Sequence, residues 1–284
     1  MKSVYRSPEG KEKILNRYNE ILKYWPMPCE KITVPTSFGD TFVIACGADT
    51  DKAVVLLHGS STNSAMWMGD AATLGKKRRV YAVDIIGEPG NSAETRPDPR
   101  GTNYGQWLSE VMDGLGIDKA AVVGNSLGGW MALNLAAFAP ERVESIVLIA
   151  SGGLSSIRLS SFMLKALTYS LLGKRGEKKL NNLVYGDIEM PEEVLSFGKL
   201  VGANYIPRTK GYGAYPDNVL SKLSMPVLYI AGDSDALMPT KKNAARLKQL
   251  VPHADIRVLE GRPHALIGLA DDIAEFIDRQ SVND

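Results

Sequence analysis

Six short apolar runs recur between residues 53 and 259, and each is followed by a stretch with apolar residues at helical spacing. Five of the six runs are continuous rather than alternating, which is typical of strands buried on both faces of a parallel sheet. The alternation of strand and helix predicts a doubly wound α/β sheet with helices on both faces. The predicted strands are residues 53–57, 80–83, 120–123, 146–149, 227–230 and 256–259.

The first fifty or so residues follow a different pattern. Residues 9–24 carry apolar side chains at helical spacing, and two prolines close the segment. Two β-rich runs, 31–34 and 41–45, follow with a turn-like stretch between them. We therefore expect a helix and then an antiparallel hairpin ahead of the parallel strands.

A long interruption separates the fourth and fifth of the six runs. About 75 residues between Ala150 and Pro226 contain no strand-like run, and a structureless loop of that length is improbable in a compact domain. We expect a helical insertion that lies over one edge of the sheet as a lid. This divides the chain into core residues 1–152, a helical lid at 153–217 and core residues 218–284.

Composition and charge favour an ordinary globular protein. The net charge of +1 argues against a dedicated surface for nucleic acid or anionic membranes. The polar start lacks the apolar core of a secretory signal, and no apolar run is long enough for a membrane span. The two cysteines match no metal or redox motif. We expect a cytoplasmic protein with a small-molecule substrate, no nucleic-acid partner and no membrane span; the oligomeric state is left open.

The third of the six runs ends in Gly124-Asn125-Ser126-Leu127-Gly128, and a helical pattern follows. Gly-x-Ser-x-Gly between a strand and a helix is the spacing of a nucleophile elbow, a turn too tight for side chains two positions before and after the serine. The serine lies near a helix N-terminus, which favours developing negative charge. We predict that Ser126 is the nucleophile and that the Leu127 N–H is one oxyanion donor.

The first run is followed by His58-Gly59-Ser60. A backbone N–H in this loop can supply a second oxyanion donor opposite Leu127, and we choose that of Ser60 because it directly follows the His-Gly pair. Gly59 permits the sharp turn. We expect His58 to hold the loop by hydrogen bonds rather than to take part in chemistry.

An acid and a base are needed beyond the nucleophile. Asp235 and Asp233 both follow the fifth run. We favour Asp235 as the acid because it lies further past the strand. Asp233 is expected to stabilise the turn by a hydrogen bond to the backbone two residues on. His264 follows the last strand at the end of the sheet where ligands bind, whereas His253 precedes that strand and is expected to be a solvated surface residue. The predicted triad is Ser126, Asp235 and His264.

With these motifs in place, the chain resembles the α/β-hydrolases from about residue 30 to residue 280. The motifs that carry the resemblance are His58-Gly59, Asp84 to Ser92, Gly124-Asn125-Ser126-Leu127-Gly128-Gly129, Gly232-x-x-Asp235 and His264. It implies the α/β-hydrolase fold, with a mostly parallel central sheet, an antiparallel N-terminal hairpin, helices on both faces and a helical lid.

A narrower resemblance is to bacterial carboxylesterases of the naproxen-esterase type. It is carried by Asp84-Ile85-Ile86-Gly87, Tyr104-x-x-Trp107-Leu108 and Leu115-Gly116-Ile117. This resemblance implies a carboxylic ester substrate. Two departures weaken the transfer of substrate specificity: Gly87-Glu88-Pro89-Gly90 stands where many family members have Gly-His-Gly, and the base is approached by Gly-Arg-Pro-His.

The expected activity is hydrolysis of carboxylic esters through an acyl-enzyme, with no metal or organic cofactor. Four apolar residues of the insertion are candidates for the substrate pocket, unless they simply pack the insertion onto the sheet. They are Ile157, Leu159, Phe162 and Met163. Acyltransferase, perhydrolase and carbon–carbon bond hydrolase activities use the same triad and remain alternatives, as does a non-catalytic small-molecule-binding protein.

Overall fold

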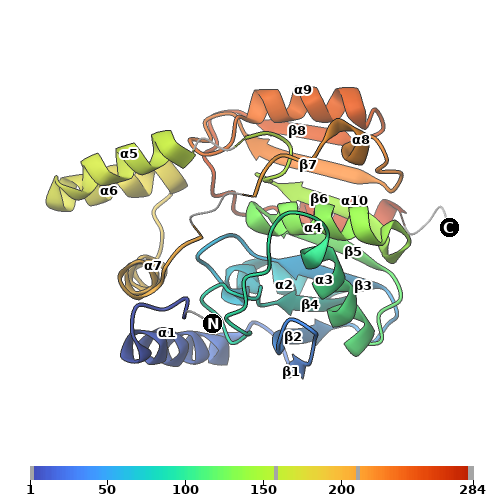
Figure 1. Cartoon of the computed structure of the whole chain (residues 1–284), viewed down its shortest axis with the longest axis horizontal. Coiled ribbons are helices and arrows are strands. Elements are labelled where there is room, and N and C mark those ends of the chain that lie inside the picture. The colour runs from blue at the N-terminus through green and yellow to red at the C-terminus, as the bar shows by residue number, and fades with distance from the viewer. Residues whose placement is uncertain (1–2, 157–158, 209–211, 281–284) are drawn as a thin grey trace.

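The computed structural model describes residues 3–156, 159–208 and 212–280 (Figure 1). In these residues eight strands form one sheet in the order β1-β2-β4-β3-β5-β6-β7-β8. The strands are β1 (Cys29–Val34), β2 (Thr41–Gly47), β3 (Ala53–Leu57), β4 (Arg79–Val83), β5 (Ala120–Asn125), β6 (Val143–Ile149), β7 (Val227–Gly232) and β8 (Asp255–Leu259). β2 pairs antiparallel with β1 and β4, and every other pair is parallel. The predicted hairpin and doubly wound sheet are confirmed.

Ten α-helices accompany the sheet within the described residues. They are α1 (Pro8–Ile21), α2 (Met68–Leu74), α3 (Asn103–Gly114), α4 (Leu127–Phe138), α5 (Leu159–Ser170), α6 (Gly173–Tyr185), α7 (Glu192–Asn204), α8 (Asp217–Leu220), α9 (Thr240–Leu250) and α10 (Ala270–Gln280). Short 3₁₀ turns occupy Leu22–Tyr24, Ser64–Trp67 and Pro140–Arg142. None of these helices is both long and apolar enough to cross a membrane.

Each central strand is buried on both faces, which explains its continuous apolar run. In β3, Val55 and Leu57 pack into one hydrophobic cluster with α3, α4 and α9. The alternate residues Val54 and Leu56 pack into a second cluster with α1, α2 and α10 on the opposite face. The sheet therefore lies between two helical layers, and its parallel strands end together at one side, where ligands bind in such folds.

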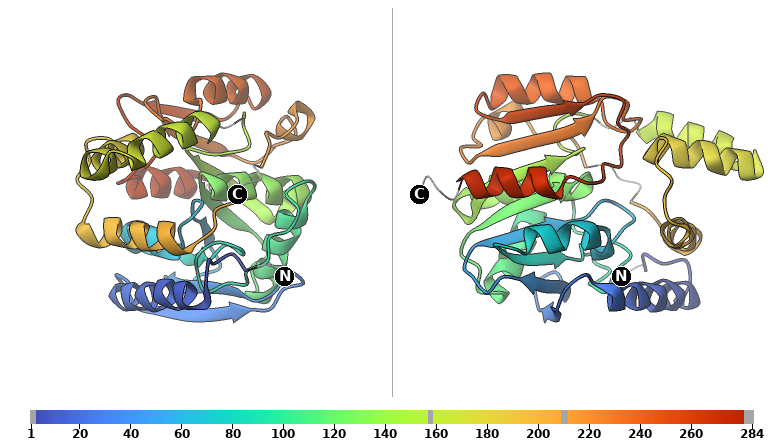
Figure 2. Two further views of the ribbon diagram at one scale, coloured as in Figure 1. Left: turned by 60° about the vertical axis from the view of Figure 1, so that its left-hand side comes forward. Right: turned by 180° about the vertical axis from the view of Figure 1, so that it is seen from behind.

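The long interval between β6 and β7 is helical, as expected, and holds α5, α6, α7 and α8. Figures 1 and 2 show α5, α6 and α7 beyond one end of the sheet rather than against either of its faces. α7 lies beside α1, where Val201 and Tyr205 share a small apolar cluster with Ile14. The domain boundaries at 153 and 217 and the role of this insertion as a lid stay predictions.

Candidate active site

Ser126 lies at a strained junction between β5 and α4. Its backbone has φ 51° and ψ −103°, a region that residues other than glycine rarely adopt. The Ser126 N–H donates to the Ile149 carbonyl of β6 at 2.8 Å, and its own carbonyl accepts from the Gly152 N–H at 3.0 Å. These two bonds fix the turn, and α4 begins at the next residue, Leu127.

The two glycines of the elbow are sterically required. A Cβ at Gly124 would lie 2.4 Å from the backbone of Gly128, and a Cβ at Gly128 would lie 2.0 Å from the Leu57 carbonyl oxygen. Both distances are far below normal contact, so no side chain fits at either position. The predicted tightness of this turn is confirmed.

The loop after β3 passes directly beside this serine. A Cβ built at Gly59 would lie 3.0 Å from the Asn125 Oδ1 and 3.9 Å from the Ser126 Cβ. Within the described part of the chain, the N–H groups of Ser60 and Leu127 have no hydrogen-bond acceptor. Two unpaired N–H groups near a serine at a helix N-terminus are what the predicted oxyanion hole requires.

His58 holds this loop and is not available for chemistry. The ring is fully buried. Its Nε2 accepts from the Ile85 N–H at 2.9 Å, and its Nδ1 donates to the Gly59 carbonyl at 2.8 Å. This pattern requires a neutral ring, and burial lowers the pKa of His58 accordingly. The loop-holding role expected of His58 is confirmed.

Asp235 and His264 form a hydrogen-bonded pair. The His264 Nδ1 lies 2.7 Å from the Asp235 Oδ2. The other carboxylate oxygen accepts from the N–H groups of Leu237 and Met238 at 2.7 and 2.8 Å, and the Asp235 side chain is fully buried. A carboxylate held in this way fixes the orientation of the imidazole and leaves Nε2 free to face a nucleophile.

The three predicted triad residues follow different parallel strands. Ser126 follows β5, Asp235 follows β7 and His264 follows β8, so all three lie at the end of the sheet where the strands terminate. The structure brings Asp235 and His264 into contact. Among the residues that it describes, it has no hydrogen bond between His264 and Ser126. Such bonds are often long in unliganded enzymes and shorten when substrate binds.

The two rejected candidates have other roles. The Asp233 Oδ1 accepts from the Gly261 N–H at 2.8 Å and so joins the loop after β7 to the loop after β8. The bond to the backbone two residues on that we expected of Asp233 belongs instead to Asp235, which bonds to Leu237. His253 is exposed, as expected, and its Nε2 donates to the Met225 carbonyl at 3.0 Å.

Comparison with known proteins identifies the family of the chain. The family model described as alpha/beta hydrolase fold matches residues 52–177. The uncharacterized carboxylesterase nap of Bacillus subtilis (strain 168) is 31% identical over 257 residues, which cover 88% of this chain and 85% of that protein. The chain belongs to the α/β-hydrolase family.

Two solved structures are similar to this chain over nearly its whole length. A putative hydrolase from Bacillus subtilis has a TM-score of 0.83 and 27% identity, covering 96% of this chain and 99% of that one. The naproxen esterase (carboxylesterase NP) from Bacillus subtilis has a TM-score of 0.78 and 28% identity, covering 98% and 97%. The protein is a carboxylesterase-like hydrolase, and the resemblance inferred from its motifs is confirmed.

A group of aromatic rings that the sequence pattern did not predict lies beside the candidate site. The rings of Tyr212 and Tyr215 lie 5.4 and 5.5 Å from that of Trp130. A Cβ built at Gly152 would lie 3.0 Å from the Tyr212 ring, and the Gly152 N–H bonds to the Ser126 carbonyl. Tyr212 therefore lies next to the elbow. Its only signal in the sequence is the richness of residues 205–216 in glycine, tyrosine and proline.

The four pocket candidates of the insertion stay predictions. Ile157 lies outside the described residues, and Leu159 and Met163 lie in α5 but their side chains are not described. Phe162 is half-buried.

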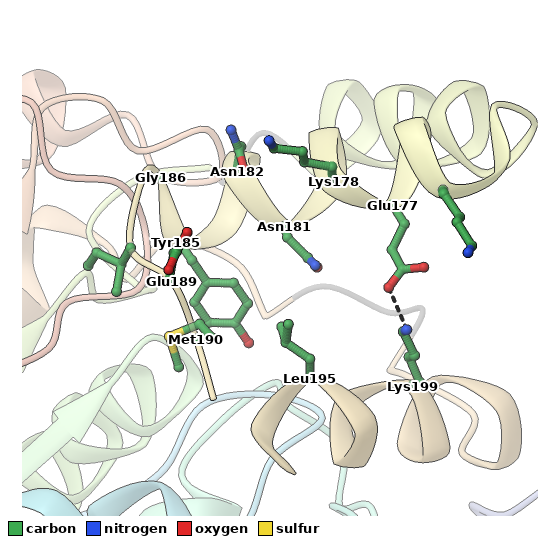
Figure 3. A pocket seen from close by; sticks show the side chains of 12 residues that line it. Glu177, Lys178, Asn181, Asn182, Tyr185, Gly186, Glu189, Met190, Leu195 and Lys199 are labelled. Atoms are coloured by element: carbon green, nitrogen blue, oxygen red, sulfur yellow. Dashed lines mark ion pairs between the residues drawn. The ribbon is translucent and has the colours of Figure 1, made fainter. Parts of the chain in front are cut away.

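A separate groove of about 550 Å³ lies between α6 and α7 (Figure 3). Tyr185 and Leu195 line it, and an ion pair between Glu177 and Lys199 at 2.5 Å spans it. Of the described residues that line this groove, none belongs to the predicted triad or oxyanion hole.

Proposed function

We propose that this hydrolase cleaves carboxylic esters of small to medium molecules through an acyl-enzyme formed on Ser126. The observation that carries the proposal is the contact of buried Asp235 with part-buried His264 at 2.7 Å, at the same end of the sheet as the strained serine of the elbow. Two of the similar proteins, carboxylesterase nap and the naproxen esterase, are named as carboxylesterases, which supports the ester as the substrate class.

In the proposed mechanism His264 removes the hydroxyl proton of Ser126 as the oxygen attacks the ester carbonyl. The N–H groups of Ser60 and Leu127 donate to the oxyanion of the tetrahedral intermediate. His264 then protonates the leaving alcohol, and water attacks the acyl-enzyme by the same route in reverse. Asp235 keeps the proton of the neutral imidazole on Nδ1 and stabilises the imidazolium that forms in each half-reaction.

The test combines a chromogenic ester panel of graded acyl length with intact-mass labelling by a serine-directed phosphonate. Ser126→Ala should lower turnover by roughly 10⁴–10⁶-fold and abolish labelling, as in comparable triads. Ser196→Ala is the matched control, because this serine of α7 is exposed and, among the residues that the structure describes, its hydroxyl bonds only to the Glu193 carbonyl. More than about a tenth of wild-type turnover in folded Ser126→Ala would refute the assignment.

Product analysis with water, alcohol or peroxide as acceptor separates ester hydrolysis from acyl transfer and perhydrolysis. Release of the free acid as the main product in the presence of alcohol is the expected result.

A further inference from the structure

Glu88 is a buried carboxylate in the loop that follows β4, with no exposed side-chain surface. Its Oε2 accepts from the Ser61 N–H at 2.7 Å and from the Tyr205 hydroxyl at 2.9 Å. Its Oε1 accepts from the Arg208 Nε at 2.6 Å. This is the residue at which the chain departs from the Gly-His-Gly turn of many relatives, and the proposed mechanism gives it no role.

The Ser61 contact places Glu88 next to the proposed oxyanion hole. Ser61 has φ 60°, a left-handed conformation that is unfavourable for a residue other than glycine. It directly follows Ser60, the proposed oxyanion donor. The Ser61 N–H and the Ser60 carbonyl share one planar peptide unit, so the bond to Glu88 fixes that unit. The Ser60 N–H belongs to the preceding unit, which is joined to the fixed one through the Ser60 Cα. The hydrogen bond to Glu88 therefore restrains the orientation of the Ser60 N–H.

Both oxygens of the Glu88 carboxylate also contact the insertion between β6 and β7, Oε2 through Tyr205 and Oε1 through Arg208. Arg208 and Tyr205 both follow α7 in the chain. The Arg208 guanidinium also donates from Nη2 to the Ile86 carbonyl at 2.7 Å and from Nη1 to the Tyr104 hydroxyl. A planar guanidinium with three acceptors holds one carboxylate orientation, which a lysine ammonium cannot reproduce.

The geometry points to Glu88 as a positioning residue of the proposed oxyanion hole: its carboxylate, oriented by Arg208 and Tyr205, holds the loop so that the Ser60 N–H faces the developing oxyanion. This inference rests on the proposed function. An oxyanion donor acts only when it lies about 2.7–3.1 Å from the oxygen of the transition state. A relaxed loop therefore lowers kcat and the affinity for tetrahedral analogues, and leaves KM nearly unchanged.

The first variant is Glu88→Gln. A glutamine has one acceptor oxygen and must turn its NH₂ group toward either Ser61 or Arg208, both of which are donors. We expect kcat to fall about 10- to 100-fold, which is no larger than the loss of kcat caused by deleting an oxyanion donor. KM should stay within about threefold of the wild-type value. The inhibition constant of a boronic acid with the matching acyl group, which forms a tetrahedral adduct on serine, should rise by the same factor as kcat falls.

Arg208 supplies a second, independent pair of variants in case Glu88→Gln does not fold. Arg208→Met should lower kcat in the same direction, and Arg208→Lys should recover part of the loss, because lysine keeps the charge near Glu88. A role in stability alone would lower the melting temperature in these variants without moving kcat or the boronate affinity of the folded protein.

Glu94→Gln is the matched control. Its carboxylate accepts from a backbone N–H (Val4, 3.0 Å), a hydroxyl (Ser3, 2.7 Å) and a cation (Lys11, 2.7 Å), the same three kinds of partner that Glu88 has. None of these partners belongs to the loop after β3. We expect this variant to keep wild-type kcat and boronate affinity.

The inference is overturned if folded Glu88→Gln keeps kcat within twofold, if its loss appears only in KM, or if boronate affinity does not fall with kcat. Failure of the proposed function gives a different result: Ser126→Ala would keep its activity, and the boronate would not inhibit the wild-type protein. If only the Glu88 inference fails, Ser126→Ala still loses its activity and the boronate still inhibits the wild-type protein.

Discussion

Replacing Asp235 with asparagine tests how the predicted base is oriented. In the wild type the Asp235 Oδ1 accepts two backbone N–H groups, from Leu237 and Met238, while Oδ2 faces the His264 Nδ1. An asparagine has one oxygen and one NH₂ group, so it must choose which side receives the oxygen. The two N–H groups decide the choice, because only the oxygen can accept hydrogen bonds from them.

The size of that preference follows from the hydrogen bonds. With the amide reversed, both N–H donors would face the NH₂ group. The buried Met238 N–H left without an acceptor costs about 1–3 kcal/mol, and the part-buried Leu237 N–H adds to that cost. The NH₂ group is therefore held toward His264, whose Nδ1 must then accept, which moves the ring proton to Nε2. A ring protonated at Nε2 cannot take the serine proton, and we expect kcat at neutral pH to fall roughly 10³–10⁴-fold.

The assay is steady-state hydrolysis of a chromogenic ester, together with ¹⁵N spectra of histidine-labelled protein. The chain has only three histidines, so the protonated nitrogen of His264 can be assigned. Asp233→Asn is the control, because this exposed side chain needs one oxygen to keep its bond to Gly261, and its turnover should stay within about threefold of wild type. A folded Asp235→Asn protein with more than a tenth of wild-type kcat, or with the proton still on Nδ1, would refute the reasoning.

Two further predictions concern stability. Gly128→Ala should destabilise the fold by at least about 1–3 kcal/mol and abolish turnover, because its Cβ would lie 2.0 Å from the Leu57 carbonyl oxygen. Gly198 is an exposed residue of α7, and a Cβ there would meet no atom within 4 Å beyond its chain neighbours and the helix's own backbone, so Gly198→Ala should instead stabilise the fold by about 0.5–1 kcal/mol in thermal melts. Burial raises the pKa of Asp70 from 3.8 to about 6. Above pH 6, ionising this carboxyl therefore costs free energy in the folded state. Between pH 3.8 and 6, the folded protein binds a proton at Asp70 more readily than the unfolded chain does. Asp70→Asn should therefore stabilise the protein by about 1–2 kcal/mol at pH 8 and by almost nothing at pH 4, and an equal gain at both pH values would contradict the assigned cause.

The strands were predictable because burial on both faces leaves a direct mark on the sequence. β3 has the predicted bounds, and its five residues are all buried. β6 begins three residues earlier than its apolar run, at Val143 rather than Ile146. The intervening Glu144 pairs with the buried guanidinium of Arg78 at 2.9 Å, and a paired charge in a strand breaks an apolar run without breaking the strand.

The geometry of the candidate site was predictable where it is encoded in a short motif. The elbow is such a motif, because steric crowding forces glycine at two fixed positions around the serine. Glu88 and Arg208 were not predictable as a pair, since they lie 120 residues apart and neither belongs to a repeating pattern. Their contact exists only because the insertion returns to the end of the sheet. The same reason explains why Tyr212 was missed.

The insertion between β6 and β7 contacts the candidate site in two places, near the predicted base and near the loop of the predicted oxyanion donor. The Val184 carbonyl at the end of α6 accepts from the Ala265 N–H at 2.9 Å, one residue after the predicted base. Arg208, beyond α7, reaches the loop of the predicted oxyanion donor through Glu88. An insertion that only covered the substrate would affect KM, because it would contribute binding shared by the ground state and the transition state. This insertion is anchored beside both the predicted base and the predicted donor, so we expect substitutions at its anchors to act on kcat even where no side chain touches the substrate.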